Sequence, residues 1–264
     1  MFSDIKKLEE IVKLAAHEIL IPHLGEHDFI YKDDGSIVTK ADVAMQERLN
    51  GDLMQAWPQY GLLGEEMTEQ QQMEVIDGDD AYWCIDPLDG TNNYAAGMPL
   101  YAVSIALIND GIAELGLIYD PSRDEMFTSL KGQGAYLNGE RLSHRESTHH
   151  AGSIVAEIEM KRLPEELVVR LVTEGPYGSH RNSGSSAIDW CWLAAGRFNV
   201  YLHGGQKLWD YAAGHLILDE TRGRSISLDG EPVFRGKLEA RSVLASLDEN
   251  LFNDWCKWIG VPYQ

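Results

Sequence analysis

The sequence predicts a mixed fold in which an α+β N-terminal half precedes an α/β C-terminal half. Apolar residues at helical spacing dominate residues 1–57, and short apolar runs separated by tight turns fill residues 82–139. In the rest of the chain, strands and helices alternate. The composition turns polar and His-rich at 143–152, so we expect a domain boundary there, between domains of residues 1–145 and 146–264.

Two helices are expected before the first buried strand. They span residues 5–19 and 41–57, with a loop or hairpin at 33–40 between them. Asp42 lies in the first turn of the second helix, three residues after Thr39. Because the first N–H groups of a helix have no partners within it, a carboxylate at this spacing caps the helix, and spacing alone favours that role.

The apolar runs of the N-terminal half predict an antiparallel meander, because turns rich in Gly, Asn and Asp separate them. Strands are expected at 82–85, 101–108, 112–119, 126–130 and 135–137. The polar run from Thr68 to Asp80 is expected to be an exposed, mobile connection.

The C-terminal half alternates between strands and helices. Strands are expected at 154–158, 198–202 and 242–245, and helices after Pro164, at 187–195, at 209–220 and from Asp248 to Ile259. His144, His149 and His150 lie in the polar linker, where exposed side chains explain them better than a metal site does.

The loop after the first buried strand combines two kinds of chemistry. Pro87 cannot donate to a sheet ladder, so the strand is expected to stop at Asp86. Asp86 and Asp89 can point at one spot, and Gly90 lets the backbone approach a ligand closely. Thr91 has the chemistry of a helix start, where free N–H groups attract anions. The loop therefore offers oxygen ligands for a divalent cation beside donors for a phosphate.

Composition narrows the class of partner. The chain has 264 residues, 44% of them hydrophobic, and a formal net charge of −20, which argues against nucleic acid or an anionic membrane as a direct partner. No apolar run is long enough to span a bilayer, and the N-terminus lacks the apolar core of a signal peptide. Cys84, Cys191 and Cys256 are expected to be buried free thiols in a reducing, cytoplasmic setting.

Three motifs carry a resemblance to a known family. In order and rough spacing, they resemble the motifs of the inositol monophosphatase family. The three motifs are Gly64-Glu65-Glu66, the run from Asp86 to Thr91, and the run from Trp209 to Gly214. The resemblance covers nearly the whole chain. It implies a layered α/β/α/β/α sandwich of the sugar phosphatase type. An N-terminal antiparallel-sheet domain would pack against a smaller C-terminal α/β domain, with the active site between them.

The same resemblance implies a magnesium centre with two or three ions per site. Asp86 would bridge two ions, and a third, weaker ion would join Glu65. The ligands that match the family are Glu65, Asp86, the carbonyl of Leu88, Asp89 and Asp210. Magnesium prefers such oxygen donors, and so many carboxylates would repel one another without a cation.

The resemblance also assigns roles in hydrolysis of a phosphate ester. Glu65 and Thr91 would orient the attacking water, with Asp42 hydrogen-bonded to Thr91. The N–H groups of Gly90 and Thr91 would hold the phosphate. The remaining substrate contacts would come from Gly184, Ser185, Ser186, His203 and Asp210.

Several substrates and one other class of function stay open. The first expectation is hydrolysis of inositol monophosphate by a lithium-sensitive, homodimeric enzyme, because Thr91-Asn92-Asn93-Tyr94 is closest to that branch of the family. Fructose 1,6-bisphosphate and other sugar or nucleotide phosphates are the alternatives. A non-catalytic regulatory or assembly subunit is the alternative of another class. A degenerate subunit would have lost ligands, whereas every matching position here keeps its acid.

His203 is the one departure from the family pattern that bears on substrate choice. Members commonly place a Glu at this distance before the Trp-Asp motif, where it accepts hydrogen bonds from substrate hydroxyls. A neutral His offers one donor and one acceptor instead, and a protonated one would attract a second anionic group. We hypothesise that His203 faces the substrate and favours sugar phosphates or bisphosphates. The alternative is a solvent-facing His at a strand end.

Overall fold

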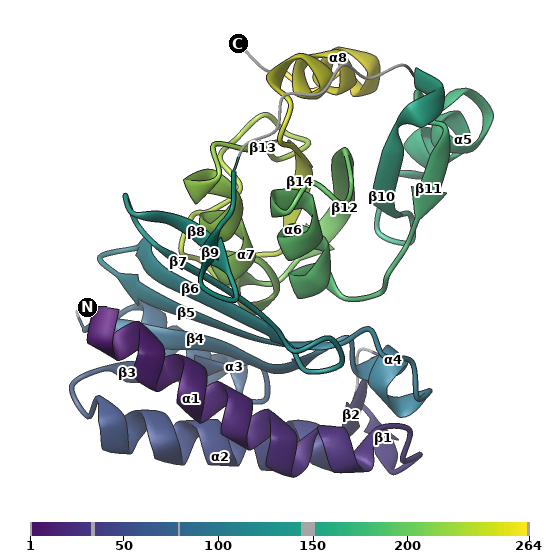
Figure 1. Cartoon of the computed structure of the whole chain (residues 1–264). Coiled ribbons are helices and arrows are strands. Elements are labelled where there is room, and N and C mark those ends of the chain that lie inside the picture. The colour runs from purple at the N-terminus through teal and green to yellow at the C-terminus, as the bar shows by residue number, and fades with distance from the viewer. Residues whose placement is uncertain (1, 33–34, 79, 144–150, 263–264) are drawn as a thin grey trace.

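The computed structural model describes residues 2–32, 35–78, 80–143 and 151–262. Figure 1 shows five layers: a helical layer, a sheet, two central helices, a second sheet and an outer helical layer. This is the α/β/α/β/α sandwich that the family resemblance implies. No helix of the described residues is long and apolar enough to cross a membrane. His144, His149 and His150 lie outside the described residues.

The lower sheet has seven strands, and a separate hairpin lies beside it. The hairpin pairs β1 (Phe29–Tyr31) with β2 (Ile37–Thr39). The seven strands, in spatial order, are β3 (Gly61–Gly64), β4 (Tyr82–Asp89), β5 (Ala102–Asn109), β6 (Ile112–Asp120), β7 (Glu125–Leu130), β8 (Gly134–Leu137) and β9 (Glu140–Arg141). Only β3 and β4 pair in parallel; the rest form the predicted antiparallel meander.

The upper sheet has five strands. Their spatial order is β11 (Ser179–Arg181), β10 (Val155–Glu159), β12 (Val200–Gln206), β14 (Arg241–Ser246) and β13 (Arg224–Ile226). The first three pair in parallel and β14 is antiparallel to both neighbours.

Helices form the other layers, and Figure 1 shows which sheet each one covers. Below the lower sheet lie α1 (Phe2–Ile19) and α2 (Lys40–Ala56); above the upper sheet lie α5 (Glu165–Glu174) and α8 (Glu249–Ile259). Between the sheets lie α6 (Ser186–Ala194) and α7 (Leu208–Glu220). The short helices are η1 (Ile21–His23), α3 (Glu69–Ile76), α4 (Thr91–Ala95) and η2 (Ala151–Ser153).

Close packing of α7 on the lower sheet depends on small residues. A Cβ at Gly116 of β6 would lie 2.8 Å from the carbonyl oxygen of Ala213, and one at Gly214 would lie 2.4 Å from the Cβ of Trp190 in α6. The largest core cluster surrounds this contact and takes buried residues from both halves of the chain. The small residues after Asp210 therefore allow the helix to lie close to another backbone.

Two local predictions are wrong. The polar run from Thr68 to Asp80 contains the helix α3, which begins with a capping box in which Thr68 and Gln71 satisfy each other's backbone N–H groups. The strand β4 does not stop at Asp86 but continues to Asp89. It passes through Pro87 because the register against β5 shifts there, and a bulge leaves that residue without a ladder partner.

Candidate metal centre

The bulge in β4 places Asp86 and Asp89 on one face of the sheet. On a regular strand, residues three apart face opposite sides. Here Asp86 pairs with Ser104 and Asp89 with Ala102, so three steps along β4 match two steps along β5. Since Ser104 and Ala102 share a face, the two aspartates do as well. The N–H of Leu88 donates to Asp86 Oδ1 at 3.0 Å and fixes this carboxylate inside the bulge.

Asp210 reaches the same point from α7. It lies in the first turn of the helix, where its Oδ2 accepts the N–H of Lys207 at 2.8 Å. The hydroxyl of Ser104 on β5 donates to the carbonyl of Trp209 at 3.1 Å, which ties this helix start to the lower sheet. Asp210 therefore both caps α7 and belongs to the candidate site.

Asp86, Asp89 and Asp210 form an acidic triad, in which one carboxylate oxygen from each residue lies within 4.8 Å of the other two. Burial raises the pKa of all three, and for Asp86 and Asp210 the neighbouring carboxylates contribute to the rise. The resulting pKa is about 6 for Asp89 and about 8 for Asp210. In the described part of the chain, no Lys or Arg forms an ion pair with the triad. Such a donor set fits a hard divalent cation.

Glu65 follows β3 and lines the same cavity, although it is not one of the three clustered carboxylates. Its N–H donates to the carbonyl of Ile85 at 3.3 Å, beside Asp86. Gln72 of α3 is buried and donates to the carbonyls of Gly64 at 2.9 Å and Glu65 at 3.3 Å. The helix that the sequence analysis missed therefore holds this part of the site.

Lys32 of the β1–β2 hairpin pairs with the acidic motif after β3. Its Nζ lies 2.9 Å from Glu65 and 2.6 Å from Glu66. Burial raises the pKa of Glu65 to about 7, and the charge of Lys32 opposes that rise. Sequence reasoning missed Lys32, because only the fold of the hairpin brings it to Glu65.

Asp42 and Thr91 meet as expected. Asp42 is buried, and one carboxylate oxygen caps α2 by accepting the N–H of Thr39 at 2.7 Å. The hydroxyl of Thr91 lies 3.0 Å from the other oxygen of Asp42 and 3.0 Å from the carbonyl of Leu88, and donates to one of them at a time. Gly90 precedes α4 with a φ of 87°, a left-handed conformation that favours glycine.

The loop before α6 approaches the triad from the C-terminal half. The Ser185 hydroxyl and the N–H of Ala187 both donate to Asp89 Oδ2, the latter at 2.9 Å. Asn93 of α4 donates to the carbonyl of Ser183 at 2.8 Å and so connects the loop to the start of α4. Gly184, Ser185 and Ser186 all line the metal cavity.

Two further buried acidic residues form hydrogen bonds with this loop. Glu157 of β10 accepts the N–H of Ser183 at 2.8 Å, and Asp189 of α6 accepts the Ser183 hydroxyl. Among the described residues, the other carboxylate oxygen of Glu157 has no hydrogen-bond partner. Burial raises the pKa of Glu157 to about 7. Sequence reasoning missed both residues, although an acidic residue within an apolar strand is a signal for Glu157.

His203 is not the solvent-facing residue of the alternative interpretation. It is 5% exposed and lines the cavity that holds the triad. Its Nδ1 accepts the N–H of Gly205 at 3.0 Å, which leaves Nε2 as the protonated nitrogen of the neutral ring. Burial, followed by the charge of Arg162, lowers the pKa of His203 to about 3. The ring is therefore neutral near pH 7 and does not itself attract an anion.

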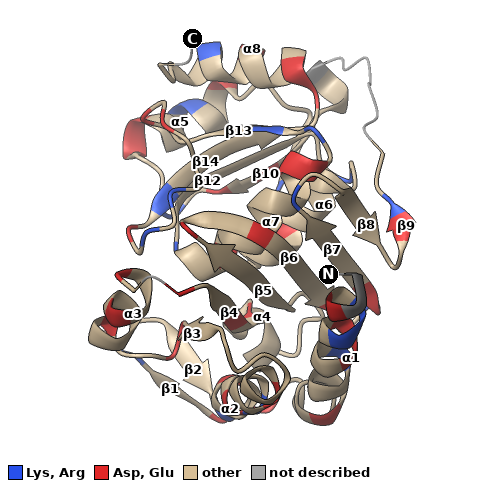
Figure 2. Cartoon of the chain, turned by 90° about the vertical axis from the view of Figure 1, so that its left-hand side faces the viewer, with Lys and Arg blue, Asp and Glu red and all other residues tan. Residues whose placement is uncertain are grey.

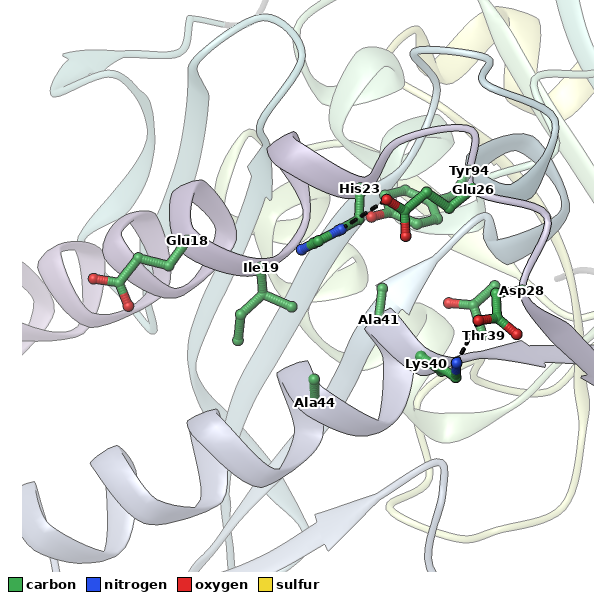
Figure 3. A pocket seen from close by; sticks show the side chains of 10 residues that line it. All are labelled: Glu18, Ile19, His23, Glu26, Asp28, Thr39, Lys40, Ala41, Ala44 and Tyr94. Atoms are coloured by element: carbon green, nitrogen blue, oxygen red, sulfur yellow. Dashed lines mark hydrogen bonds and ion pairs between the residues drawn. The ribbon is translucent and has the colours of Figure 1, made fainter.

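A second cavity, drawn in Figure 3, lies between the end of α1 and the start of α2. Glu26 contacts His23 and Lys40 contacts Asp28 there, so its charged side chains largely pair with one another. None of its lining residues lines the metal cavity. The acidic triad and the candidate substrate contacts belong to the other cavity, whose volume is about 300 Å³.

A layered sandwich whose two halves bring carboxylates together between the sheets defines the fold of the metal-dependent sugar phosphatases. The model of the inositol monophosphatase family matches residues 3–257. The chain belongs to the inositol monophosphatase family, whose members include phosphomonoesterases with acidic metal sites.

Relatives with two kinds of name match most of the chain. A fructose-1,6-bisphosphatase/inositol-1-monophosphatase of Aquifex aeolicus is 32% identical over 239 residues, which are 87% of this chain and 88% of the relative. Nus factor SuhB of Pasteurella multocida is 34% identical over 203 residues, 75% of this chain and 74% of the relative. The crystal structure of the extragenic suppressor protein suhB from Bartonella henselae matches with a TM-score of 0.84 at 27% identity, covering 97% of this chain and 98% of that one.

Proposed function

We propose that this protein hydrolyses a small phosphate monoester with Mg²⁺, and that inositol monophosphate is the first substrate to test. The acidic triad Asp86, Asp89 and Asp210 is the observation that supports this best, because two parts of the chain converge on it beside Glu65 and Thr91. Fructose 1,6-bisphosphate and other sugar or nucleotide phosphates are the alternative substrates. The Aquifex relative carries a name that joins two of these activities.

In this proposal the chain supplies oxygen ligands for two or three ions. They are the carboxylates of Glu65, Asp86, Asp89 and Asp210 and the carbonyl of Leu88. Bound Mg²⁺ would neutralise the phosphate ester and make hydroxide available near neutral pH. Binding of a metal ion by Glu65 would require this carboxylate to separate from Lys32, because the same carboxylate forms the ion pair with Lys32.

The other residues act on the water and the phosphate. Thr91, which Asp42 orients, and Glu65 would accept hydrogen bonds from the attacking water. The N–H groups of Gly90 and Thr91 would hold the phosphate oxygens. Gly184, Ser185, Ser186 and His203 would contact the rest of the substrate, and Asp210 would contact it from the metal side.

A phosphate-release assay tests the proposal. Hydrolysis of inositol 1-phosphate should require added Mg²⁺, stop in a chelator and fall with lithium or calcium. Asp86→Asn and Asp210→Asn each keep an acceptor oxygen but lose a charge. Both variants should lose at least a hundredfold in rate while the metal-free protein stays as stable, because relief of carboxylate repulsion offsets the weaker hydrogen bonds. Full activity in the chelator, or near-normal turnover of both variants, would refute the metal assignment.

A non-catalytic regulatory or assembly role is the second candidate, because several relatives are named Nus factor SuhB. Retention of every carboxylate ligand favours the enzyme. We also propose a cytoplasmic homodimer without direct contact with membranes or nucleic acid, in keeping with the net charge of −20. Light scattering during gel filtration tests the dimer, and an RNA-binding titration at physiological salt tests the absence of nucleic-acid contact.

A further inference from the structure

A further cavity lies where α1 begins and α2 ends, and its volume is about 200 Å³. Figure 1 shows these two helix ends on the same side of the molecule, and this side faces the viewer in Figure 2. The cavity shares no lining residue with the metal cavity. Strands of the lower sheet supply an apolar floor through the buried side chains of Leu107, Leu115 and Leu130.

Three aromatic rings form one wall of this cavity. The ring centroid of Trp83 on β4 lies 5.3 Å from that of Trp57, which follows α2, and 5.7 Å from that of Tyr60. Trp57 and Trp83 are both buried, so packing fixes their rings. The face of an aromatic ring attracts a cation. Trp57 already does so in the structure, because Nζ of Lys7, which does not line the cavity, lies 5.1 Å from its ring centroid.

The charges around the cavity also favour a cation. Asp4 and Glu114 line it, and none of the described residues that line it is Lys, Arg or His. Oε1 of Glu114 accepts the side-chain N–H of Asn109 at 3.0 Å, which fixes this carboxylate. The helix α2 ends at Ala56 without a basic residue in its last turn, so no side chain of that turn offsets the partial negative charge of the helix end.

A buried donor on the aromatic wall gives a second, independent indication of a ligand. Trp83 is 2% exposed, and among the described residues its Nε1 has no hydrogen-bond partner. A buried N–H without an acceptor is costly, and native structures contain few such groups. Because Trp83 lines the cavity, an occupant that carries an acceptor oxygen would satisfy this donor.

We propose that this cavity binds a small quaternary ammonium ion that carries a hydroxyl group. The aromatic wall and the two carboxylates attract the charge, the leucine floor accommodates the methyl groups, and the hydroxyl oxygen accepts from Trp83. A carboxylate in place of the hydroxyl would be repelled by Asp4 and Glu114. The volume of about 200 Å³ lies below the range of drug-sized ligands, so the occupant is small. This site does not depend on the proposed hydrolysis.

Calorimetric titration of the full chain with three probes tests the proposal. Choline carries both features, 3,3-dimethylbutan-1-ol has the same shape without the charge, and tetramethylammonium has the charge without the hydroxyl. Choline should bind at least about tenfold more tightly than the neutral alcohol and several-fold more tightly than tetramethylammonium. In heteronuclear NMR, the indole N–H signal of Trp83, identified by its loss in Trp83→Phe, should shift and saturate with the same affinity.

Variants separate recognition of the cation from general structure and charge. Tyr60→Leu removes an aromatic face and keeps an apolar side chain, and Glu114→Gln keeps the acceptor for Asn109 without the charge. Each should weaken choline binding about fivefold and leave the affinity for the neutral alcohol within about twofold. Glu47→Gln, at an exposed position of α2 outside the cavity, removes the same charge and is the matched control that should change nothing.

Four results would overturn the site. They are no saturable binding of choline, equal affinities for choline and the neutral alcohol, binding that leaves the Trp83 signal unchanged, and equal losses in Glu47→Gln and Glu114→Gln. Binding that is absent in the wild-type protein and present in Lys7→Gln would also overturn it, because the aromatic face would then serve the lysine of the chain itself. Phosphate release plays no part in these measurements, so failure of the proposed function would leave the test intact.

Discussion

Asp42 and Asp210 show how a single carboxylate serves both a helix end and a site. Each caps the first turn of its helix with one oxygen, and Asp42 presents the other to Thr91 while Asp210 belongs to the acidic triad. From sequence alone, capping and catalysis compete as explanations of such a residue. In the structure they support each other, because the cap fixes the direction of the carboxylate.

The buried acid Glu157 makes a prediction about pH. Its pKa is raised from 4.5 to about 7 by burial, so between these values the unfolded chain has lost a proton that the native state keeps. Native stability from this group is present below pH 4.5 and is lost as pH rises to 7. Glu157→Gln keeps the acceptor for Ser183 without the charge. The free energy of unfolding of this variant, relative to that of the wild type, should therefore rise by up to roughly 3 kcal/mol between pH 5 and pH 8.

Urea unfolding at the two pH values measures this difference. Glu140→Gln, at an exposed position of β9, is the control. Its free energy of unfolding should differ from that of the wild type by the same small amount at both pH values. The charge of Glu157 also raises the pKa of buried Asp189, so the variant removes this repulsion too, which acts in the same direction. A Gln variant that is less stable than the wild type at pH 8 would show that Glu157 has an ionised role.

At the scale of elements, the hairpin β1–β2 has a contact with the site that its own sequence does not reveal. Lys32 neutralises Glu65 and Glu66 in the structure and competes with any cation that Glu65 binds. Lys32→Gln should therefore lower the Mg²⁺ concentration for half-maximal activity or thermal stabilisation several-fold, because the potential at Glu65 becomes more negative.

The same variant should raise amide exchange in the hairpin, which loses a tie to the acidic motif. Lys40→Gln is the matched control, because within the part of the chain that the structure describes Lys40 forms an ion pair with exposed Asp28 and with no residue of the acidic motif. Unchanged Mg²⁺ dependence in Lys32→Gln would show that Glu65 is not a metal ligand in this protein.

Elements with strong local signals were predictable and those that depend on tertiary contacts were not. The meander was predicted because apolar runs and Asn-Gly or Asp-Gly turns recur, and β14 and α8 because a buried run and the cap Asp248 mark them. The helix α3 was missed because its polar composition outweighed the capping box at Thr68. The candidate ligand carboxylates were predicted through motifs, whereas only the fold brings Lys32, Gln72 and Glu157 near them.

At the scale of the whole molecule, two sheets share one core. We propose residues 1–145 and 146–264 as structural domains, each with its own sheet. The largest core cluster includes Cys84 and Ala106 of the lower sheet and Tyr201 and Ala245 of the upper one, around α6 and α7. Neither half can bury this surface alone.

The shared core predicts a single unfolding transition. Calorimetry of the metal-free chain should give equal calorimetric and van't Hoff enthalpies, because separating the halves exposes the cluster around α6 and α7. Two resolved transitions, or a fragment 146–264 that folds by itself, would show that the domains are independent.

The contact between Gly116 and Ala213 has an expected consequence for the ionic radius that the candidate metal site would accept. Asp86 and Asp89 belong to the lower sheet and Asp210 to α7, so the span between their oxygens depends on how far the helix stands from the strands. Oxygen ligands lie about 0.3–0.5 Å farther from calcium than from magnesium. A methyl group at Gly116 would require a displacement of at least that size. We therefore expect discrimination between the two metals to depend in part on Gly116, which lies outside the triad and acts through the thickness of the helix–sheet contact.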